Sequence, residues 1–566
     1  MIRKLLAFTM SLTLILSGCG QGTVSTPPGN GNANTTPPVV ITPTTASAAI
    51  KHVVVIFGEN ISFDHYFGTY PNAVNTPAEP QFTSVASTPI PNNYVSNPSL
   101  LTQNPNLATN GTANSQNNAI GAAANPFRLS RAQALTADQD HGYTDEQKAF
   151  DGGKMDLFPV SVGTANTAAQ SAATGAPAIA GTKALTMAYY DGNTVTALWN
   201  YAQHYAMNDH SFSTVFGPST PGAINVISGQ TNGVVNTVNP GGAVIGDGNG
   251  GVTDIGDADP TGDICSSTTS SINLSGKNIG DLLNTAKQTW GWFEGGFDLT
   301  ITNPNGTTGC SRSTVSAITG TQADYSAHHQ PFQYYASTMN PNHTRPSSVA
   351  AIGTTDAANH QYDIHDFTDA LAAGNMPAVS FLKAPRYQDA HAGNSDPLDE
   401  QTFVVNIVNA IEKSSFWSST AIIIAYDDSD GWYDHVYNPV NGSATTADAV
   451  NGTGVCISAA AAAAALPGLT GTAPAQGRCG YGPRQPLLVI SPWAKKNYLD
   501  TTVTDQASVV RFIEDVFLSS QRIGGGSADA IAGSLTNMFD FSNGAAPPNP
   551  NVVQLNPTTG VVTSGN

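Results

Sequence analysis

The chain has 566 residues, with 40 acidic and 21 basic side chains and a formal net charge of −19 at pH 7. This balance disfavours nucleic acid as a partner, because a phosphate backbone is bound by a basic face. Charged residues make up only 11% of the chain, against about 25% in an average soluble protein, a composition that suits a secreted protein. The length allows one large domain or two.

Residues 1–18 predict export. Arg3 and Lys4 precede an apolar run from Leu5 to Leu16, which is too short to span a bilayer. The run ends in the pattern Leu-Ser-Gly-Cys at Cys19, which is typical of a bacterial lipoprotein cleavage site. We therefore expect a cell-envelope lipoprotein anchored in the membrane through lipidated Cys19. Gly20 gives no signal for the inner membrane, so the outer membrane is expected, on its periplasmic or surface side. The alternative is an ordinary secretory signal with an incidental Cys19.

Residues 19–48 are rich in Thr, Pro, Gly and Asn and are expected to form a disordered tether. A folded region is expected over residues 49–540 and a disordered tail over 541–566. Within the folded region, three stretches of Ala, Gly, Thr and Asn are interpreted as surface loops or a cap over the sheet edge: about 156–190, 232–275 and 441–480.

The first predicted strand, Val53–Phe57, is followed by Glu59 and Asn60. Ligands of open α/β sheets bind at the carboxyl ends of strands, and oxygen donors at such an end suit a hard divalent cation. The alternative is a helix N-terminus, capped by Asn60 or Ser62, with a solvated Glu59.

Ser219 lies in the segment Phe216–Gly222, where Pro and Gly residues stiffen the backbone around its hydroxyl. A serine is a poor nucleophile unless a base or a metal lowers its pKa. No Gly-x-Ser-x-Gly elbow surrounds Ser219, so a metal is the expected activator. Taken alone, the segment is an ordinary turn.

Histidines can hold phosphoryl oxygens or protonate a leaving group. By position, His391 is the best candidate, because it follows the apolar strand predicted at Ala378–Leu382. Twelve histidines occur in the chain, and a lone histidine is more often structural.

A helical stripe at residues 403–411 precedes a third apolar strand, Ala421–Tyr426, which ends in Asp427 and Asp428. Two adjacent carboxylates repel each other unless a cation lies near them. The alternative, an acidic turn in solvent, is weakened because the strand before it is fully apolar.

A fourth strand is expected at Pro486–Ile490 and a late helix at Ser508–Leu518. Continuous apolar strands that alternate with helices predict a mostly parallel sheet buried on both faces, in an αβα sandwich.

Four cysteines remain after Cys19, an even number that indicates disulfides in an exported chain. We expect Cys265–Cys310 and Cys456–Cys479, because each pair brackets an inserted stretch. Each bond would stabilise the fold by about 2–4 kcal/mol.

These segments together resemble the bacterial phosphoesterase family, which contains phospholipases C and acid phosphatases and belongs to the alkaline phosphatase superfamily. The likeness extends over about residues 50–520. It is carried by IKHVVVIFGENISFDHYFGTYP, DHGYTDEQKAFDGGKMD, FGPSTPGAINVISGQTNG, HHQPFQYYA, MPAVSFLKAPRYQDAH, TAIIIAYDDSDGWYDHV, GYGPRQPLLVISPWAK and SVVRFIED.

The resemblance implies an alkaline-phosphatase-like sandwich and a metal-dependent phosphoric-ester hydrolase. It implies one divalent metal ion of unknown identity, held by Glu59, Asn60, Ser219, Asp427 and Asp428. Ser219 is the implied nucleophile, forming a phosphoserine that water hydrolyses. The residues implied to contact the phosphate, and so to assist catalysis, are His141, His329 and His391. Asp434 and His435 match a family motif without an assigned role.

Three departures bear on the substrate. Phospholipase members usually carry Thr at the nucleophile and an Asn-Arg pair after the following Pro, where this chain has Ser219, Gly222 and Ala223. The usual Asp-Glu pair is Asp427-Asp428. Long phospholipases also continue into C-terminal β-domains. The first and the third of these departures favour an acid phosphatase. An acidic pH optimum is expected, because cationic histidines favour phosphate binding.

Three alternatives remain. The first is a phospholipase C with the same machinery, for which a choline headgroup would need an aromatic or acidic cage. The second is a sulfatase, disfavoured because Ala223 stands where its maturation motif needs Arg. The third is a non-catalytic surface lipoprotein that only binds phosphate.

Overall fold

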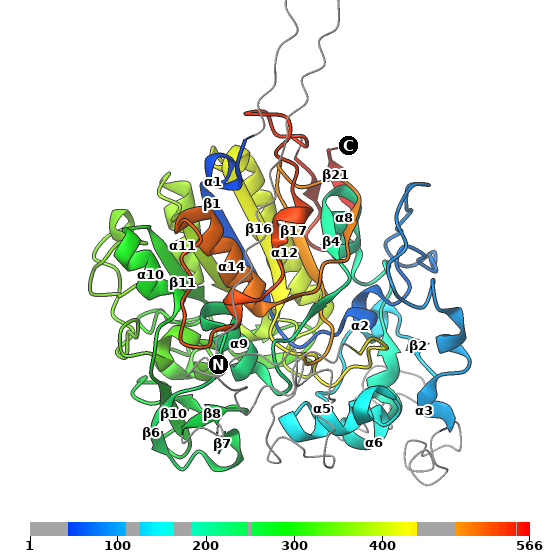
Figure 1. The fold of residues 1–566 in the computed structure, drawn as a ribbon, viewed down its shortest axis with the longest axis horizontal. Coiled ribbons are helices and arrows are strands. Elements are labelled where there is room, and N and C mark those ends of the chain that lie inside the picture. Colours follow the sequence, from blue (N-terminus) through cyan, green and yellow to red (C-terminus); the bar gives the residue numbers. More distant parts are fainter. Residues whose placement is uncertain are drawn as a thin grey trace, which may run out of the picture. The chain divides into compact units, whose positions relative to one another are not determined.

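The computed structural model describes residues 44–108, 125–163, 183–246, 251–437, 481–550 and 552–565, all of which belong to one compact unit. A central sheet contains eight strands in the order β14-β11-β15-β1-β16-β17-β4-β18 (Figure 1). In that order the strands are Gln361–Asp363, Trp290–Glu294, Val379–Lys383, His52–Gly58, Thr420–Tyr426, Leu487–Ile490, Ala206–Asn208 and Tyr498–Asp500.

The four strands expected from sequence are β1, β15, β16 and β17. β1 pairs in parallel with both β15 and β16 and so occupies the middle of the sheet. β17 runs antiparallel to its neighbours β16 and β4, and the other pairs in the sheet are parallel. The sheet is therefore mostly parallel, as predicted.

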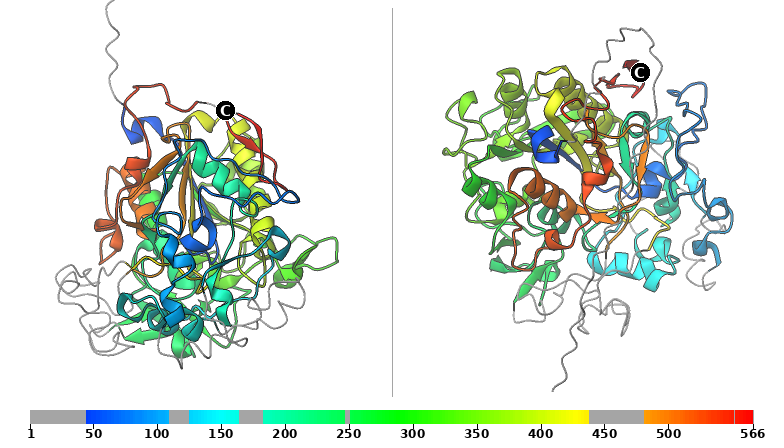
Figure 2. Two further views of the ribbon diagram at one scale, coloured as in Figure 1. Left: turned by 90° about the vertical axis from the view of Figure 1, so that its right-hand side faces the viewer. Right: turned by 45° about the horizontal axis from the view of Figure 1, so that its top comes forward.

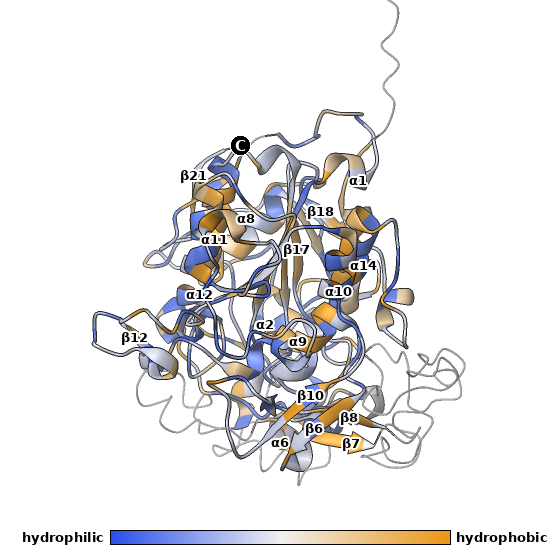
Figure 3. Cartoon of the chain, turned by 90° about the vertical axis from the view of Figure 1, so that its left-hand side faces the viewer, coloured by the Kyte–Doolittle hydropathy of each residue, from blue (hydrophilic) through white to orange (hydrophobic). Residues whose placement is uncertain are grey.

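Helices cover both faces of this sheet, which gives the expected αβα sandwich. Figure 3 shows α1, α10 and α14 on one face and α8, α11 and α12 on the other. These helices span, in chain order, Ala46–Ala49, Thr196–His204, Ile279–Ala286, Ile364–Ala372, Pro397–Lys413 and Gln506–Phe517. α12 and α14 are the two helices predicted around residues 403–411 and 508–518. None of the helices in the described part of the chain is long and apolar enough to cross a membrane.

The central strands β1 and β16 contain long apolar runs because both of their faces are covered. Val53, Val54 and Val55 of β1 are fully buried, and so are Ile422 and Ile423 of β16. Burying one such side chain stabilises the fold by about 1.5–3 kcal/mol. The two strands that precede the predicted ligands thus lie within the buried core.

Smaller elements gather beyond the carboxyl ends of β1 and β16 (Figures 1 and 2). The expected insertion at 232–275 contains β6 (Val234–Val238), β7 (Val244–Gly246), β8 (Val252–Asp254), β9 (Asp259–Pro260) and β10 (Ser271–Leu274). The other elements are α2 (Phe63–Phe67), α3 (Pro105–Ala108), α5 (Tyr143–Phe150), α6 (Phe158–Ser161), α9 (Ser219–Ser228), β2 (Phe127–Arg128), β3 (Ala188–Tyr189), β5 (Ser211–Phe212), β12 (Ser313–Ser316), β13 (Gly320–Ala323) and β19 (Thr504–Asp505).

One predicted disulfide is confirmed, since Cys265 is bonded to Cys310. The other, Cys456–Cys479, lies outside the described residues, as do the insertion at 441–480, the signal segment and most of the tether. The insertion at 156–190 is not simply a surface loop, because Ala184, Leu185 and Met187 are fully buried.

The prediction of a disordered tail was wrong. Strands β20 (Gln554–Leu555) and β21 (Val562–Ser564) form a hairpin after residue 552. Val553 and Leu555 are buried, and the Leu555 N–H donates to Oδ1 of Asn409 in α12 at 3.1 Å. A short alternation of apolar residues is enough to dock this segment, although Pro, Asn and Thr surround it.

Candidate active site

The two predicted ligand pairs meet at the carboxyl edge of the sheet. The last residues of β1 and β16 are register partners, so Glu59 and Asn60 leave the sheet beside Asp427 and Asp428. The Asn60 N–H donates to Oδ1 of Asp427 at 3.0 Å. All four side chains are buried. The alternatives of a solvated Glu59 and a solvent-facing acidic turn are therefore wrong.

Ser219 completes this cluster. It is the first residue of α9, and its Oγ lies 3.1 Å from Oε2 of Glu59 and 3.1 Å from Oδ2 of Asp428. A Cβ atom on Gly222 would lie 2.2 Å from the backbone oxygen of Asp427. Glycine at this position thus allows α9 to approach the loop after β16 closely enough for Ser219 to reach both carboxylates.

These five residues fit a divalent cation. Oδ1 of Asn60 is buried and accepts no hydrogen bond from any described residue, whereas the buried Oδ2 of Asp427 has the ammonium of Lys383 3.6 Å away as an ion-pair partner. Leaving a buried acceptor unpartnered costs about 1–3 kcal/mol, a cost that a bound cation would offset. A donor set made only of oxygen atoms suits hard ions such as magnesium, calcium or manganese.

The charges of the cluster favour a cation as well. Burial raises the pKa of Glu59 and of Asp428 well above the usual range, and Asp427 raises both further. Both groups therefore resist ionisation when no cation is present, since a buried carboxylate beside another is penalised twice. A divalent ion would favour the ionised form of each.

The three predicted histidines surround the cluster. Nδ1 of His329 lies 3.2 Å from Oε1 of Glu59, and Nε2 of His141 lies 3.5 Å from Nδ2 of Asn60. The rings of His141 and His391 are 6.1 Å apart. The structure thus places all three at the edge of the same site.

The histidines differ in charge. Burial lowers the pKa of His329 and of His391 below the ordinary value. Burial also opposes protonation of His141, but the carboxylates of Asp428 and Asp138 outweigh it and raise its pKa to about 10. At neutral pH, His141 is therefore the cationic member of the three.

Lys383 is a site residue that sequence reasoning missed. It ends β15, is fully buried, contacts Oε1 of Glu59, and its Nζ lies 3.6 Å from Oδ2 of Asp427. Burial would lower the pKa of Lys383, but Glu59 and Asp427 outweigh it and raise that pKa. A lysine directly after an apolar strand was the available signal, at the same sheet edge as the acidic pairs.

We expect Lys383→Met to lower the melting temperature in EDTA more than in excess manganese. Removing one partner of a buried ion pair costs about 3–5 kcal/mol, and a bound cation would partly replace the lost ammonium charge. Thermal melts followed by circular dichroism, with and without metal, measure the difference. Lys148→Met is the control, because Lys148 pairs with Asp145 at the surface. An equal decrease of the melting temperature in EDTA and in manganese would contradict the expectation.

Comparison with known proteins agrees with the resemblance noted above. The family model described as "Phosphoesterase family" matches residues 50–518. The chain belongs to the phosphoesterase family. Its matched region contains the whole of the candidate site, from Glu59 to Asp428.

Curated relatives of this family member carry phospholipase names. The non-hemolytic phospholipase C of Pseudomonas aeruginosa is 30% identical over 197 residues, which cover 34% of this chain and 28% of that protein. Phospholipase C A of Mycobacterium tuberculosis is 27% identical over 184 residues, covering 32% and 33%. Non-specific phospholipase C6 of Arabidopsis thaliana is 30% identical over 149 residues, covering 24% of each. The matches thus span a third or less of these relatives.

Two further acidic residues of this family member support the site. Oδ1 of Asp430 accepts a hydrogen bond from Nδ2 of Asn60 at 3.3 Å. The Glu146 carboxylate accepts from the Gly217 N–H at 2.9 Å and from the Ser429 hydroxyl at 2.7 Å. Glu146 therefore joins the loop before Ser219 to the loop after β16. Glu146 and Asp430 lie within segments that carry the family resemblance, which was the only signal for them.

Glu146 also gives a pH-dependent prediction. Burial raises the pKa of Glu146 from 4.5 to about 7, so the folded state holds a proton that the unfolded state releases. The resulting stability is complete below pH 4.5 and is lost as the pH rises through 7. Between pH 4.5 and 8 the free energy of unfolding of the wild type should fall by about 3 kcal/mol relative to that of Glu146→Gln. Urea unfolding of both proteins across this pH range tests the prediction. Unfolding free energies that follow parallel curves against pH in the two proteins would contradict it.

Proposed function

We propose that the chain is a divalent-metal-dependent phosphoric-ester hydrolase, with Ser219 as nucleophile and phosphomonoesters as preferred substrates. One observation carries the proposal: Oγ of Ser219 lies 3.1 Å from carboxylate oxygens of both predicted ligand segments. A cation held by these carboxylates would lie beside the Ser219 hydroxyl and would activate it. The family membership and the phospholipase names of relatives support the reaction class.

Ser219 and the four residues Glu59, Asn60, Asp427 and Asp428 would hold the metal, which when bound would acidify the serine hydroxyl and offset the charge of the phosphoryl group. Ser219 Oγ attacks phosphorus and releases its proton to solvent water, and the bond from phosphorus to the ester oxygen breaks. His141 is placed to contact phosphoryl oxygens as a cation and to protonate the departing alkoxide. Water then cleaves the phosphoserine, which releases phosphate and restores the hydroxyl.

The preference for monoesters rests on the start of α9 and on charge. The position after Pro221 is restricted to glycine by the backbone of Asp427, so the Asn side chain of the phospholipase pattern has no room at Gly222. Ala223 offers no guanidinium for a larger headgroup. A cationic His141 favours a dianionic monoester over a singly charged diester.

A phospholipase C is the second candidate, because the relatives named above carry that name. A substrate panel separates the two. The purified protein is assayed from pH 4 to 9 with p-nitrophenyl phosphate, bis-p-nitrophenyl phosphate and phosphatidylcholine vesicles, with magnesium, manganese, calcium or zinc added singly. Fastest turnover of the monoester, with loss in EDTA, supports the proposal. Faster cleavage of phosphatidylcholine favours the phospholipase, and no turnover under any condition favours a binding protein.

We also propose that the protein is a cell-envelope lipoprotein attached through Cys19, which lies outside the described residues. The support is the sequence pattern that ends at Cys19. Metabolic labelling with a palmitate analogue should mark the wild type and leave Cys19→Ser unlabelled. Equal labelling of both proteins would refute the anchor.

A further inference from the structure

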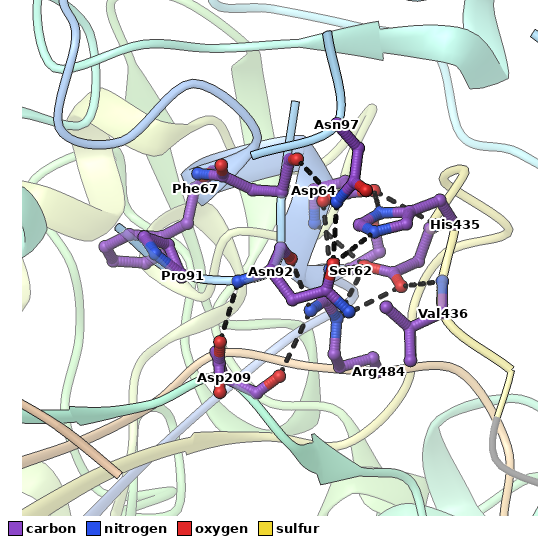
Figure 4. Close-up of polar contacts among 12 residues, drawn as sticks. Ser62, Asp64, Phe67, Pro91, Asn92, Asn97, Asp209, His435, Val436 and Arg484 are labelled. Carbon is purple, nitrogen blue, oxygen red and sulfur yellow. Dashed lines mark hydrogen bonds and ion pairs between the residues drawn. The ribbon is translucent and has the colours of Figure 1, made fainter. Parts of the chain in front are cut away.

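Arg484 lies fully buried in a network of polar contacts beside the site (Figure 4). Its Nε donates to both carboxylate oxygens of Asp434 at 3.1 Å. Its Nη2 donates to Asp64 and to Asp434, each at 3.0 Å. Its Nη1 donates to the backbone oxygens of Asn92 at 2.7 Å and Asp209 at 3.1 Å. The guanidinium is therefore held rigidly from three sides.

The two carboxylates that Arg484 binds also cross-link the chain. The Asp64 N–H donates to Oδ2 of Asp434 at 3.0 Å, and the His435 N–H donates to Oδ2 of Asp64 at 3.0 Å. The Phe63 N–H donates to the backbone oxygen of Arg484 at 2.8 Å. Two segments far apart in sequence are thus joined by hydrogen bonds around the guanidinium of Arg484.

These segments are the continuations of the two ligand pairs. Asp64 lies four positions after Asn60, and Asp434 lies six positions after Asp428. No described hydrogen bond or ion pair links Arg484 to any of the five proposed ligands. Arg484 therefore acts on the proposed ligands through the backbone segments that it holds. It is a positioning residue and not a ligand.

The ligand pairs need such a device because they repel each other. Four oxygen-bearing side chains, three of them carboxylic acids, converge where two buried loops leave neighbouring strands. A planar guanidinium that binds Asp64 at the start of α2 and Asp434 after β16 fixes the separation of the two segments, whereas a lysine ammonium provides charge without that geometry.

We propose that Arg484 positions the two ligand pairs for cation binding, by clamping helix α2, which follows β1, to the loop after β16 through Asp64 and Asp434. The proposal rests on the proposed metal site. It assigns Asp434 to positioning, and His435 to support of Asp64, since Nδ1 of His435 lies 2.6 Å from Oδ2 of Asp64.

The test compares manganese affinity in the full chain by isothermal titration calorimetry. Arg484→Lys should weaken manganese binding by about 10–100-fold, the range found when residues that orient metal ligands are altered. Its kcat should fall while KM for p-nitrophenyl phosphate changes little. Circular dichroism and thermal melting establish that the variant is folded.

Arg312 provides a matched control. It is also buried between two carboxylates, with Nε 3.1 Å from Asp324 and Nη2 2.7 Å from Asp363. Neither carboxylate is a proposed ligand. Arg312→Lys should lower the melting temperature comparably and leave manganese affinity unchanged. An equal loss of affinity in both variants would attribute the effect to general destabilisation and overturn the proposal.

A gentler variant covers the case in which Arg484→Lys does not fold. His435→Gln removes a partner of Asp64 without removing the buried arginine charge, and it should weaken manganese binding by about 2–10-fold. Wild-type affinity in a folded Arg484→Lys or, failing that, in His435→Gln would overturn the positioning role alone. Absence of manganese binding by the wild type would instead overturn the metal site, and this proposal with it.

Discussion

Ser219→Ala should reduce turnover of p-nitrophenyl phosphate by at least about 10⁴-fold, because the nucleophile of a covalent mechanism has no substitute in the site. The fold should survive. Among the described residues, Oγ of Ser219 bonds only to Glu59 and Asp428, and alanine is favourable at the start of a helix interior. Steady-state rates and circular dichroism spectra of both proteins provide the measurement.

Ser228→Ala is the matched control, since Ser228 is buried in the same helix and its hydroxyl donates to the backbone oxygens of Ile224 and Gln230 and bonds to the Tyr335 side chain, rather than to a proposed ligand. It should keep a rate close to that of the wild type. A Ser219→Ala protein that retains a tenth or more of the wild-type rate would show that another group attacks phosphorus, and the proposed mechanism would be wrong.

Asp428→Asn should weaken manganese binding by at least about 100-fold and reduce turnover by about 10³-fold or more. The substitution removes one ligand charge and keeps the shape of the side chain. In EDTA the variant should melt at a higher temperature than the wild type near neutral pH. The reason is that burial and neighbouring carboxylates already raise the pKa of Asp428, so its ionised form costs stability when no metal is bound.

Weaker manganese binding together with a higher melting temperature in EDTA is diagnostic of a metal ligand. Replacing a merely structural aspartate would lower the stability of the protein with or without the metal. Asp500→Asn serves as the comparison. Asp500 is buried and accepts from Nδ2 of Asn208 at 3.0 Å in β4, away from the proposed ligands. Asp428→Asn with wild-type manganese affinity would remove Asp428 from the metal site.

Sequence alone predicted the middle of the sheet because β1 and β16 contain continuous apolar runs and β15 is interrupted only by Ser380 before Lys383, a pattern typical of strands buried on both faces. It could not predict that β17 runs antiparallel, since an apolar run carries no information about direction. The hairpin of β20 and β21 was missed for a different reason. Its composition is that of a disordered segment, and its order comes from contacts with α12 that are distant in sequence.

The proposed ligands could be named from sequence because Glu59, Asn60, Asp427 and Asp428 directly follow predicted strands. Lys383 was overlooked because a lysine after an apolar strand usually extends its ammonium into solvent, and burial beside two carboxylates is a tertiary property. Arg484 was overlooked because it lies between Pro483 and Pro486, in a stretch typical of a turn. Its carboxylate partners come from segments 420 and 50 residues away.

The shared register of β1 and β16 restricts which mutations this protein can accept during evolution. Successive side chains of a strand point to opposite faces, so inserting or deleting one residue in either strand would turn the following pair of donors away from its partner. Point substitutions can tune the site, but changes of length within these two strands cannot be tolerated. Single-codon deletion scanning should therefore find β1 and β16 intolerant of every deletion, while the loop between β12 and β13 accepts them.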